Sequence, residues 1–312
     1  MVGVEPLKLV ENGEQAQRLL QALARDLPYS IHVTNIVENL LEYNAAGHLD
    51  GAPELRRAAV YRYAEDGDAS DGDATVVTVC KVGPQYVTVC LHSTDTTNAA
   101  LRRVLADSAV LPWGEDIHFD SVHERCVPVL LEEVRARADP ASPPRLFLTD
   151  KMYLPKEEAV NMDVSCPPGY ALLPLEVKHA VAVASAWGSN IWPGALDMVK
   201  SILMRHPGTV WGVFPADQTG GQPAARPAAQ VAGEGGFLRM LFTAEEHRRK
   251  GLGGLVTRAA CKVLAARGKD LHCNIDRPNP ASMATFTKLG FRRLCEYTYV
   301  VYFAPRQPRA TP

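Results

Sequence analysis

The chain has 312 residues, of which 46% are hydrophobic and 22% are charged, and its formal net charge is -2. This length favours two domains of ordinary globular composition. The near-neutral charge gives no reason to expect nucleic acid or an anionic membrane as a partner, and no apolar run approaches the roughly 18 residues that a membrane-spanning helix needs.

The cysteines and the N-terminal residues indicate the compartment. The seven scattered cysteines show neither a disulfide framework nor the CxxC spacing of a metal site, so we expect reduced thiols. Carboxylates near the N-terminus, including Glu5 and Glu11, argue against a secretory signal and weaken the case for a transit peptide. These features together favour a cytoplasmic protein.

The first half is predicted to begin with helices and to continue with strands. Apolar residues at helical spacing predict helices near 19–23, 36–41, 97–106 and 127–134. Alternating apolar residues predict strands at 59–63, 75–81, 86–92, 117–120 and 145–149. The Asp- and Gly-rich segment 65–73 lacks the spacing of a calcium loop, and we expect a solvated loop there.

Proline-rich segments at 138–144 and 156–169 mark the passage to a second half, and we divide the chain into domains at 1–155 and 156–312. Strands are predicted in the second half at 170–175, 209–214, 237–243, 270–275 and 296–303, with a poor strand within 224–231 because of Pro227. Helices are predicted at 176–187, 196–205, 252–264 and 280–289. This alternation predicts an α/β protein with mixed sheets.

The most informative segment joins the strand 237–243 to the helix that begins at Leu252. A helix N-terminus exposes unpaired amides and a partial positive charge. Gly251 and Gly253 let an anion approach the backbone, and the basic residues at 248–250 add charge beside it. We therefore predict an anion-binding turn, although a plain helix start with exposed basic side chains has the same local pattern. The GK[ST] of a nucleotide P-loop and the G-x-G-x-x-G of a dinucleotide site are both absent.

Two motifs in this region resemble a known superfamily. The sequence Arg-Arg-Lys-Gly-Leu-Gly at 248–253 resembles the acyl-coenzyme A motif of the GNAT acyltransferases. Asn-Pro-Ala-Ser at 279–282, followed by Phe286 and Lys-Leu-Gly-Phe at 288–291, resembles the next motif of the same superfamily. Arg239-Met240 and Glu-His-Arg at 246–248 are similar to the glycine N-acyltransferase-like branch.

That branch carries a degenerate GNAT-like half before the working one. The resemblance therefore implies two tandem GNAT-like domains, a degenerate one at 1–155 and an acyl-CoA-binding, catalytic one at 156–312. It also implies acyl-CoA, with an acetyl or longer acyl group, as co-substrate and no metal. Related acyltransferases can be mitochondrial, so the mitochondrial matrix is the alternative compartment. The oligomeric state is left open.

The resemblance also implies which residues bind the co-substrate. Pantetheine is expected along the strand where it diverges from 271–275, and the pyrophosphate on the amides of the turn. The implied binding residues are Met240, Leu241, Phe242, Arg248, Arg249, Lys250, Gly251, Leu252, Gly253, Gly254, Asn274, Asn279, Ser282 and Phe286. A strand N–H near Leu241 is expected to stabilise the oxyanion of the reaction.

At the acid–base positions the chain departs from the pattern of the superfamily that it resembles. An aliphatic ammonium, with a pKa of ~10, must lose a proton before it attacks a thioester. Glycine-conjugating relatives place a Glu before the Arg-Met pair, where this chain has Phe237, so Glu234 and His247 are the candidate bases, with His272 as another. Phe286 replaces a Tyr that protonates the departing thiolate in many GNAT enzymes; a thiol pKa of ~8.5 lets the thiolate leave unaided.

The resemblance implies transfer of an acyl group to a small amine, with glycine or another amino acid as the first candidate acceptor. Arg226 and Arg239 are possible partners for its carboxylate, and Trp187 and Trp192 flank the expected acceptor loop. A catalytically impaired acyl-CoA-binding module and a protein N-acetyltransferase are the alternatives. Cysteine nucleophiles at Cys261, Cys273 or Cys295 are a further alternative, against buried inert thiols.

Overall fold

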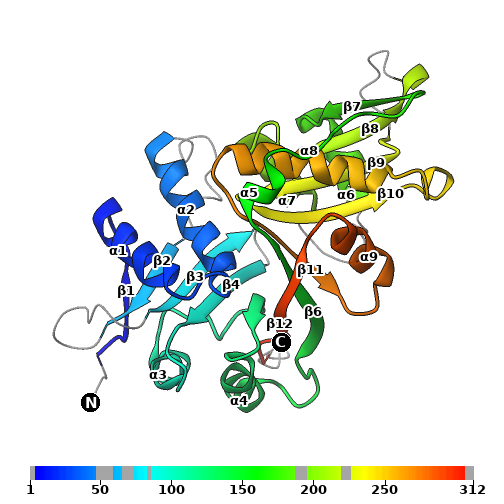
Figure 1. Cartoon of the computed structure of the whole chain (residues 1–312). Coiled ribbons are helices and arrows are strands. Elements are labelled where there is room, and N and C mark those ends of the chain that lie inside the picture. The colour runs from blue at the N-terminus through cyan, green and yellow to red at the C-terminus, as the bar shows by residue number, and fades with distance from the viewer. Residues whose placement is uncertain are drawn as a thin grey trace. The chain divides into compact units, whose positions relative to one another are not determined.

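The computed structural model describes residues 4–46, 59–64, 74–82, 86–186, 195–218 and 226–305. The chain forms two compact units, one of residues 1–149 with 295–312 and the other of residues 150–294 (Figure 1). The predictions for 65–73, Trp187 and Trp192 lie outside the described residues. No helix in the described ranges is both long and apolar enough to cross a bilayer.

The first unit is a mixed sheet covered on both faces by helices. Its strand order is β1-β2-β3-β4-β5-β12, with β1 at Leu7–Leu9, β2 at Ala59–Tyr63, β3 at Thr75–Val82, β4 at Tyr86–Ser93, β5 at Ile117–His123 and β12 at Arg292–Tyr302. Within it β4 and β5 are parallel, and the other pairs are antiparallel.

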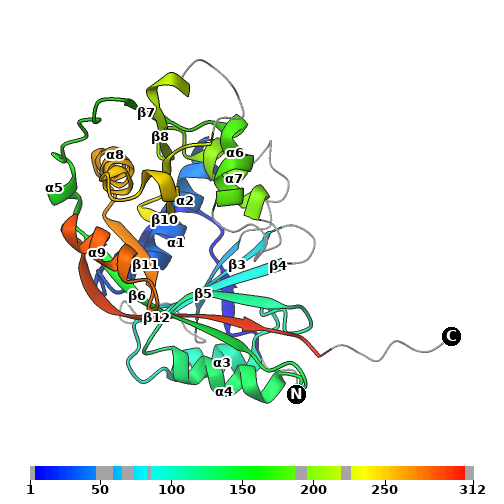
Figure 2. The same ribbon diagram turned by 90° about the vertical axis from the view of Figure 1, so that its right-hand side faces the viewer.

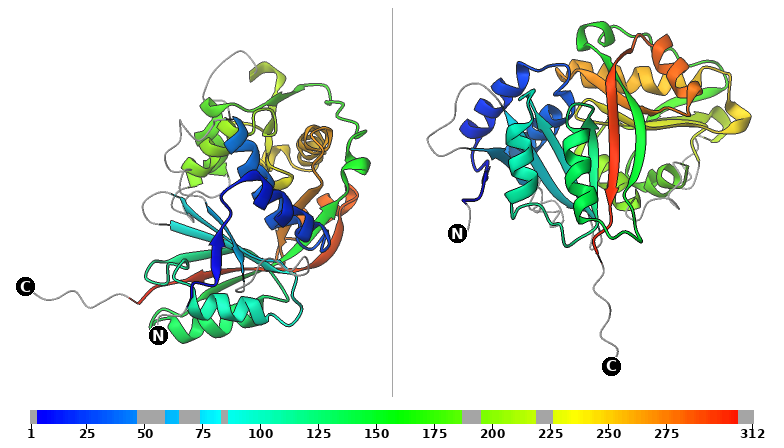
Figure 3. Two further views of the ribbon diagram at one scale, coloured as in Figure 1. Left: turned by 90° about the vertical axis from the view of Figure 1, so that its left-hand side faces the viewer. Right: turned by 90° about the horizontal axis from the view of Figure 1, so that it is seen from below.

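The helices of the first unit pack as two pairs. These helices are α1 (Gly13–Ala24), α2 (Ile31–Ala46), α3 (Ala99–Asp107) and α4 (Val127–Arg137). Val76 of β3 packs with α1 and α2, whereas its neighbour Val77 packs with α3 and α4. Because successive strand residues point to opposite faces, the two helix pairs cover opposite faces of the sheet (Figure 3).

The second unit repeats this plan. Its strand order is β6-β11-β10-β9-β8-β7, with β6 at Arg145–Leu154, β7 at Tyr170–Pro174, β8 at Trp211–Pro215, β9 at Ala229–Glu234, β10 at Phe237–Thr243 and β11 at Leu271–Asp276. Strands β7 to β10 are joined antiparallel, and β10 is parallel to β11. These mixed sheets confirm the predicted fold class.

Helices cover both faces of this sheet as well. One face packs on α5 (Lys156–Ala159), α8 (Leu252–Ala266) and α9 (Pro280–Lys288), and the other on α6 (Ala180–Ala186) and α7 (Ala195–Arg205) (Figure 2). Short 3-10 turns lie at Val177–His179, Ala216–Gln218 and Glu245–His247. The apolar stripe of α8 is buried as predicted, and Gly268 follows its end with φ +80°.

Several elements differ from the sequence-based expectation. The helix expected at 176–187 is a 3-10 turn followed by the shorter α6. The strand expected within 224–231 begins only at Ala229, beyond Pro227, which lacks the N–H that a ladder needs. Strand β1 and helix α5 were not predicted, because three- and four-residue elements carry too little periodic signal.

The C-terminal residues do not belong to the same compact unit as the rest of the predicted second domain, 156–312. Residues 295–312 belong to the first unit, because β12 pairs with β5 from Tyr297↔His123 to Tyr302↔Ile117. The functional division into a degenerate first half and a working second half stays a prediction.

Candidate functional site

A β-bulge interrupts β10 before the basic turn. The pairing of β10 with β9 shifts register between Arg239 and Phe242, and the buried Met240 has φ +59°. A non-glycine residue in this region costs roughly 1–2 kcal/mol and persists only where its surroundings fix it. Such bulges re-aim side chains and end pairing next to functional sites.

Strands β10 and β11 separate beyond their first pair. Their ladder consists of Phe237↔His272, and the His272 N–H donates to the Gly236 carbonyl at 3.0 Å. Both strands are described throughout, and no further pair joins them. The β11-facing edge of β10 at 240–242 therefore has no β-ladder partner among the described residues, an arrangement that suits an extended ligand.

The turn after β10 presents a row of unpaired amides. Arg249 has φ +62° and Gly251, the N-cap of α8, has φ +77°. Leu255 is the first residue of the helix whose N–H is bonded within it, to the Gly251 carbonyl at 3.0 Å. Among the described residues, the N–H groups from 249 to 254 have no acceptor. Successive free amides at a helix N-terminus form an anion-binding concavity.

The two glycines of the turn serve different purposes. A Cβ at Gly251 would meet nothing within 4 Å, so this glycine is required by its positive φ and keeps the approach to the amides open. A Cβ at Gly253 would lie 3.0 Å from Thr243 Oγ1, so this glycine lets α8 begin tightly against the end of β10.

The basic side chains of the turn are exposed, and two of them are held locally. Arg248 Nε donates to the Thr243 carbonyl at 3.2 Å. Lys250 Nζ donates to Tyr170 Oη at 3.0 Å, and the same hydroxyl lies 3.0 Å from His247 Nδ1. Tyr170 therefore positions one lysine and one histidine at the turn, and it was not singled out from the sequence.

The remaining predicted co-substrate residues lie on β11 and α9. Asn274 is half-buried on β11. The side chain of Asn279 accepts from the Ser282 N–H at 3.0 Å, so this pair caps α9. Phe286 is buried and packs edge-to-face on Phe291 at 5.0 Å between centroids, which is a packing role.

The two candidate bases lie at opposite ends of β10. Glu234 ends β9 opposite Phe237, and its Oε2 is 3.6 Å from Arg239 Nη2. His247 lies beyond the other end, in the turn, beside Tyr170. The two side chains therefore belong to different parts of the site and cannot act as a pair.

Basic side chains surround Phe237. The Phe237 ring stacks on His272 at 4.9 Å and 17°. Lys151 is 0% exposed, with Nζ 3.3 Å from His272 Nδ1 and 5.2 Å from the Phe237 centroid. The Arg239 guanidinium lies over the same ring at 4.5 Å. Lys151 is not among the site residues predicted from the sequence, because the predicted strand ends at Thr149.

The buried cysteines lack the features of nucleophiles. Burial raises the pKa of the Cys261 thiol and of the Cys273 thiol far above the ordinary value. Cys295 is buried as well. A thiol that stays protonated at neutral pH is a poor nucleophile, so packing roles fit these residues better.

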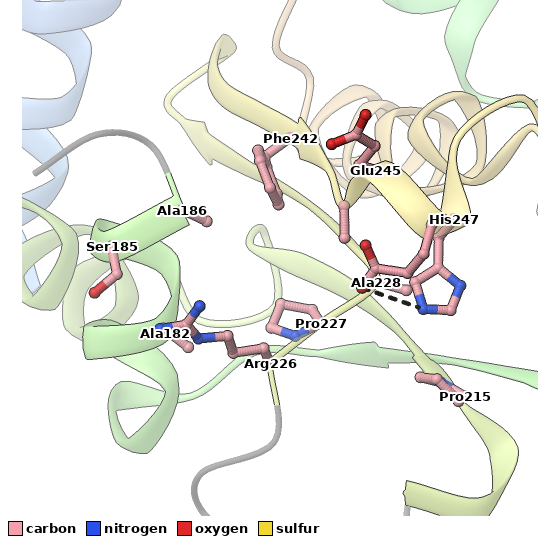
Figure 4. A pocket seen from close by; sticks show the side chains of 12 residues that line it. Ala182, Ser185, Ala186, Pro215, Arg226, Pro227, Ala228, Phe242, Glu245 and His247 are labelled. Atoms are coloured by element: carbon pink, nitrogen blue, oxygen red, sulfur yellow. Dashed lines mark ion pairs between the residues drawn. The ribbon is translucent and has the colours of Figure 1, made fainter.

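A cavity of about 520 Å³ lies beside the end of β10. Its lining includes Ala182 and Ser185 of α6, Arg226, Phe242 of β10 and His247 of the turn (Figure 4). The cavity therefore shares Phe242 and His247 with the strand and turn described above.

The first unit has an equivalent turn between β4 and α3, but a carboxylate fills it. Asn98 adopts φ 57° as the N-cap of α3. Asp95 accepts from the N–H groups of Thr97 at 2.8 Å, Ala99 at 2.9 Å and Ala100 at 3.4 Å. Desolvation acts to raise the pKa of Asp95, but these hydrogen bonds together outweigh it and lower the pKa below its ordinary value. The chain's own anion therefore occupies the place that is open in the second unit.

Comparisons with known structures identify others of the same fold. A Drosophila protein is similar over 96% of this chain and 99% of its own, at 18% identity and a TM-score of 0.79. A tandem GNAT protein from the clavulanic acid biosynthesis pathway is similar over 97% and 100%, at 13% identity and a TM-score of 0.52. A GCN5-related N-acetyltransferase from Sphaerobacter thermophilus is similar over 99% and 99%, at 11% identity and a TM-score of 0.53.

These likenesses show that the chain has the fold of the GNAT acetyltransferases in a tandem arrangement, a fold of acyl-group transferases. Residues 221–300, which contain β10, the turn and α8, match the family described as FR47-like protein. No curated protein matches the chain significantly. The similarity to the glycine N-acyltransferase-like branch stays a prediction.

Proposed function

We propose that this protein is an N-acyltransferase that moves an acyl group from acyl-CoA to a small amine. The observation that carries the proposal is the row of free amides from 249 to 254 at the end of a bulged strand whose edge is open. Free amides and basic side chains suit a pyrophosphate, and an open strand edge suits the amide groups of pantetheine.

We assign the steps of this reaction to parts of the second unit. The amine attacks the thioester carbonyl, the carbonyl electrons move onto oxygen, and the C–S bond then breaks to release the CoA thiolate. In this proposal an N–H of β10 near Leu241 donates to the oxyanion. The strand and the cavity together hold donor and acceptor in one geometry, which is itself a large contribution to rate.

Phe237 itself cannot take a proton from the amine, and the carboxylate opposite it on β9 is that of Glu234. Glu234 and His247 stay candidate bases, and His272 lies behind the Phe237 ring with 0% exposure. We therefore propose that the acceptor binds as the free amine or loses its proton to water. Arg226 in the cavity suits an acceptor with a carboxylate, which supports glycine or another amino acid as first candidate.

Phe237 and Phe286 favour one alternative, a module that binds acyl-CoA without turnover. A protein substrate is a further alternative with no observation in its favour. No nucleic acid or membrane partner is proposed, and a cytoplasmic or mitochondrial matrix location stays a prediction.

The first test is thermal unfolding of the purified chain with acetyl-CoA, longer acyl-CoAs and free CoA. A ligand at 100 times its dissociation constant stabilises the fold by about 2.7 kcal/mol. Gly251→Glu should abolish this shift, because it places a carboxylate at the free amides. Gly268→Glu is the matched control, since Gly268 has φ +80°, lies at the other end of α8 and also has nothing within 4 Å of an added Cβ.

The outcomes separate the hypotheses. A shift that Gly251→Glu loses and Gly268→Glu keeps supports the site. No shift with any CoA compound contradicts the proposal. Release of CoA thiol that requires both acyl-CoA and an amine indicates the transferase, whereas binding without amine-dependent release indicates the binding module.

A further inference from the structure

A second group of chemically reactive side chains lies in the first unit, where β4 and β5 separate. These parallel strands pair through Val89↔Phe119, and no pair follows it among their described residues. Val89 and Phe119 face α3 and α4. The next residues, Cys90 and Asp120, therefore point to the opposite face, which α1 and α2 cover.

Helix α2 adds an imidazole to these two side chains. His32 Nε2 lies 3.9 Å from Cys90 Sγ and 3.9 Å from Asp120 Oδ1. One donor atom from each of the three residues lies within 4.8 Å of the others. His32 and Cys90 are each 5% exposed, whereas the Asp120 side chain is 15% exposed, so the group is largely buried and is most exposed at the carboxylate.

The side from which the thiol and the carboxylate approach the imidazole distinguishes a catalytic triad from a metal site. In a Cys-His-Asp catalytic triad, the thiol and the carboxylate contact opposite nitrogens of the imidazole, so that one orients the ring while the other gives up a proton. Here the thiol and the carboxylate approach the same nitrogen, Nε2 of His32. Three donors that converge on one point are instead the arrangement of metal ligands.

We propose that His32, Cys90 and Asp120 form a site for Zn²⁺. Zinc is borderline-soft and binds imidazole, thiolate and carboxylate, with bond lengths of about 2.0–2.3 Å and tetrahedral geometry. Those lengths place tetrahedral ligand atoms roughly 3.3–3.8 Å apart. The two donor pairs at 3.9 Å therefore need to close by a few tenths of an ångström, and the third pair, which lies within 4.8 Å, by up to about 1 Å. On binding, the Cys90 thiol releases its proton to solvent, and water completes the fourth position.

The surroundings of the cluster support this role. Ser121 Oγ donates to Asp120 Oδ1 at 2.7 Å, which orients the carboxylate as ligand-supporting hydrogen bonds do. The adjacent Asp26 carboxylate is engaged elsewhere, at 2.7 Å from His92 Nε2 and 2.6 Å from Arg125 Nη2. This proposed site is independent of the proposed acyl transfer. It departs from the expectation that the protein binds no metal. The sequence did not indicate it, because ligands at 32, 90 and 120 do not follow any metal-binding sequence motif.

The test uses the full chain without a purification tag, freed of metal by a chelator. Calorimetric titration with Zn²⁺ should give one ion per chain, and Co²⁺ in its place should give a thiolate-to-cobalt absorption band in the near ultraviolet. Cys90→Ser should remove the band and weaken Zn²⁺ binding by more than ~100-fold, beyond the loss that follows removal of a ligand-supporting residue. Cys80→Ser, on neighbouring β3, should change neither.

Fold controls keep the result interpretable. The urea midpoint of each metal-free variant is compared with that of the metal-free parent, and His32→Gln, which retains the thiol, replaces Cys90→Ser if the latter does not fold. Absence of saturable Zn²⁺ binding, a cobalt band that survives Cys90→Ser, or several weak equivalent sites would each overturn the proposal.

Discussion

Gly233 lies where close packing leaves no room for a larger side chain. A Cβ at this position in β9 would lie 2.8 Å from Leu264 Cδ1 of α8 and 3.1 Å from the Thr209 carbonyl oxygen. The leucine end can move, but the carbonyl is backbone and cannot move without disturbing the sheet. The close approach of α8 to β9 therefore depends on this glycine.

We expect Gly233→Ala to destabilise the chain by about 1–3 kcal/mol, the usual cost of an overpacked core. Urea unfolding followed by circular dichroism measures this change. Gly13→Ala in α1 is the matched control, because an added Cβ there meets nothing within 4 Å, and it should cause no loss. An unchanged midpoint for Gly233→Ala would contradict the packing argument.

His92 links the stability of the first unit to pH. Burial lowers the pKa of His92 below its ordinary 6.5, although its contact with Asp26 opposes this shift. For Asp26, burial acts to raise the pKa, but hydrogen bonds from His92 and Arg125 outweigh it and lower the pKa below 3.8. As the pH falls, His92 and Asp26 are therefore each protonated at a higher pH in the unfolded chain than in the folded chain.

Stability should therefore fall as the pH decreases below about 6.5, where the unfolded chain protonates His92 first, and fall again below about 3.8 through Asp26. Urea midpoints measured in steps from pH 8 to about pH 3 test this expectation. His92→Gln, which cannot titrate, should flatten the upper part of this dependence. The interpretation fails if the variant keeps the full slope between roughly pH 6.5 and pH 5.

At the scale of elements, the two strand-turn-helix segments show why one is open and the other closed. The turn before α8 has glycine and basic residues around free amides, whereas the turn before α3 supplies Asp95 to the same kind of amides. A carboxylate at a helix N-terminus satisfies the amides and the helix dipole, so α3 needs no ligand there.

We expect Asp95→Ala to destabilise the chain by roughly 0.5–2 kcal/mol, the cost of losing a helix cap. Asp95→Asn, which keeps an oxygen acceptor but loses the charge, should cost less. Thermal unfolding of the three proteins gives the order. Equal losses for both variants would show that charge alone is responsible, and no loss for either would show that the cap is dispensable.

The sequence predicted those features of the elements that are local in the chain. The buried stripe of α8 and its flanking glycines follow from a repeat of 3.6 residues and from simple backbone rules, so the helix was found at nearly the observed bounds. The strand at Asp150 and Lys151 was missed, because a fully buried lysine breaks the apolar alternation by which strands are recognised.

Features that depend on the register between distant strands could not be predicted from the sequence. The bulge at Met240 and the approach of Lys151 to His272 are set by how β6, β10 and β11 align, and a single sequence contains no signal for that alignment. For the same reason, the sequence indicated the anion-binding turn but not Tyr170, which contacts His247 and Lys250 across the sheet.

At the scale of the whole molecule, two GNAT-like units do not imply two co-substrate sites. We expect one acyl-CoA to bind per chain, because the equivalent turn of the first unit is filled by Asp95. Isothermal titration of the metal-free chain measures the stoichiometry, and Gly251→Glu should reduce it to zero. A second binding event that survives in Gly251→Glu would show that the first unit also holds the co-substrate.

The path of the chain through β12 has a practical consequence for anyone who expresses parts of this protein. The first unit is assembled from two separate stretches of sequence, and the stretch that completes it follows the second unit in the chain. A fragment that stops at residue 155 lacks the strand that pairs with β5, and a fragment that starts at 156 carries that strand without its partner. Each truncated product would expose an unpaired strand edge, so we expect both to aggregate and the two units to fold only as one translated chain.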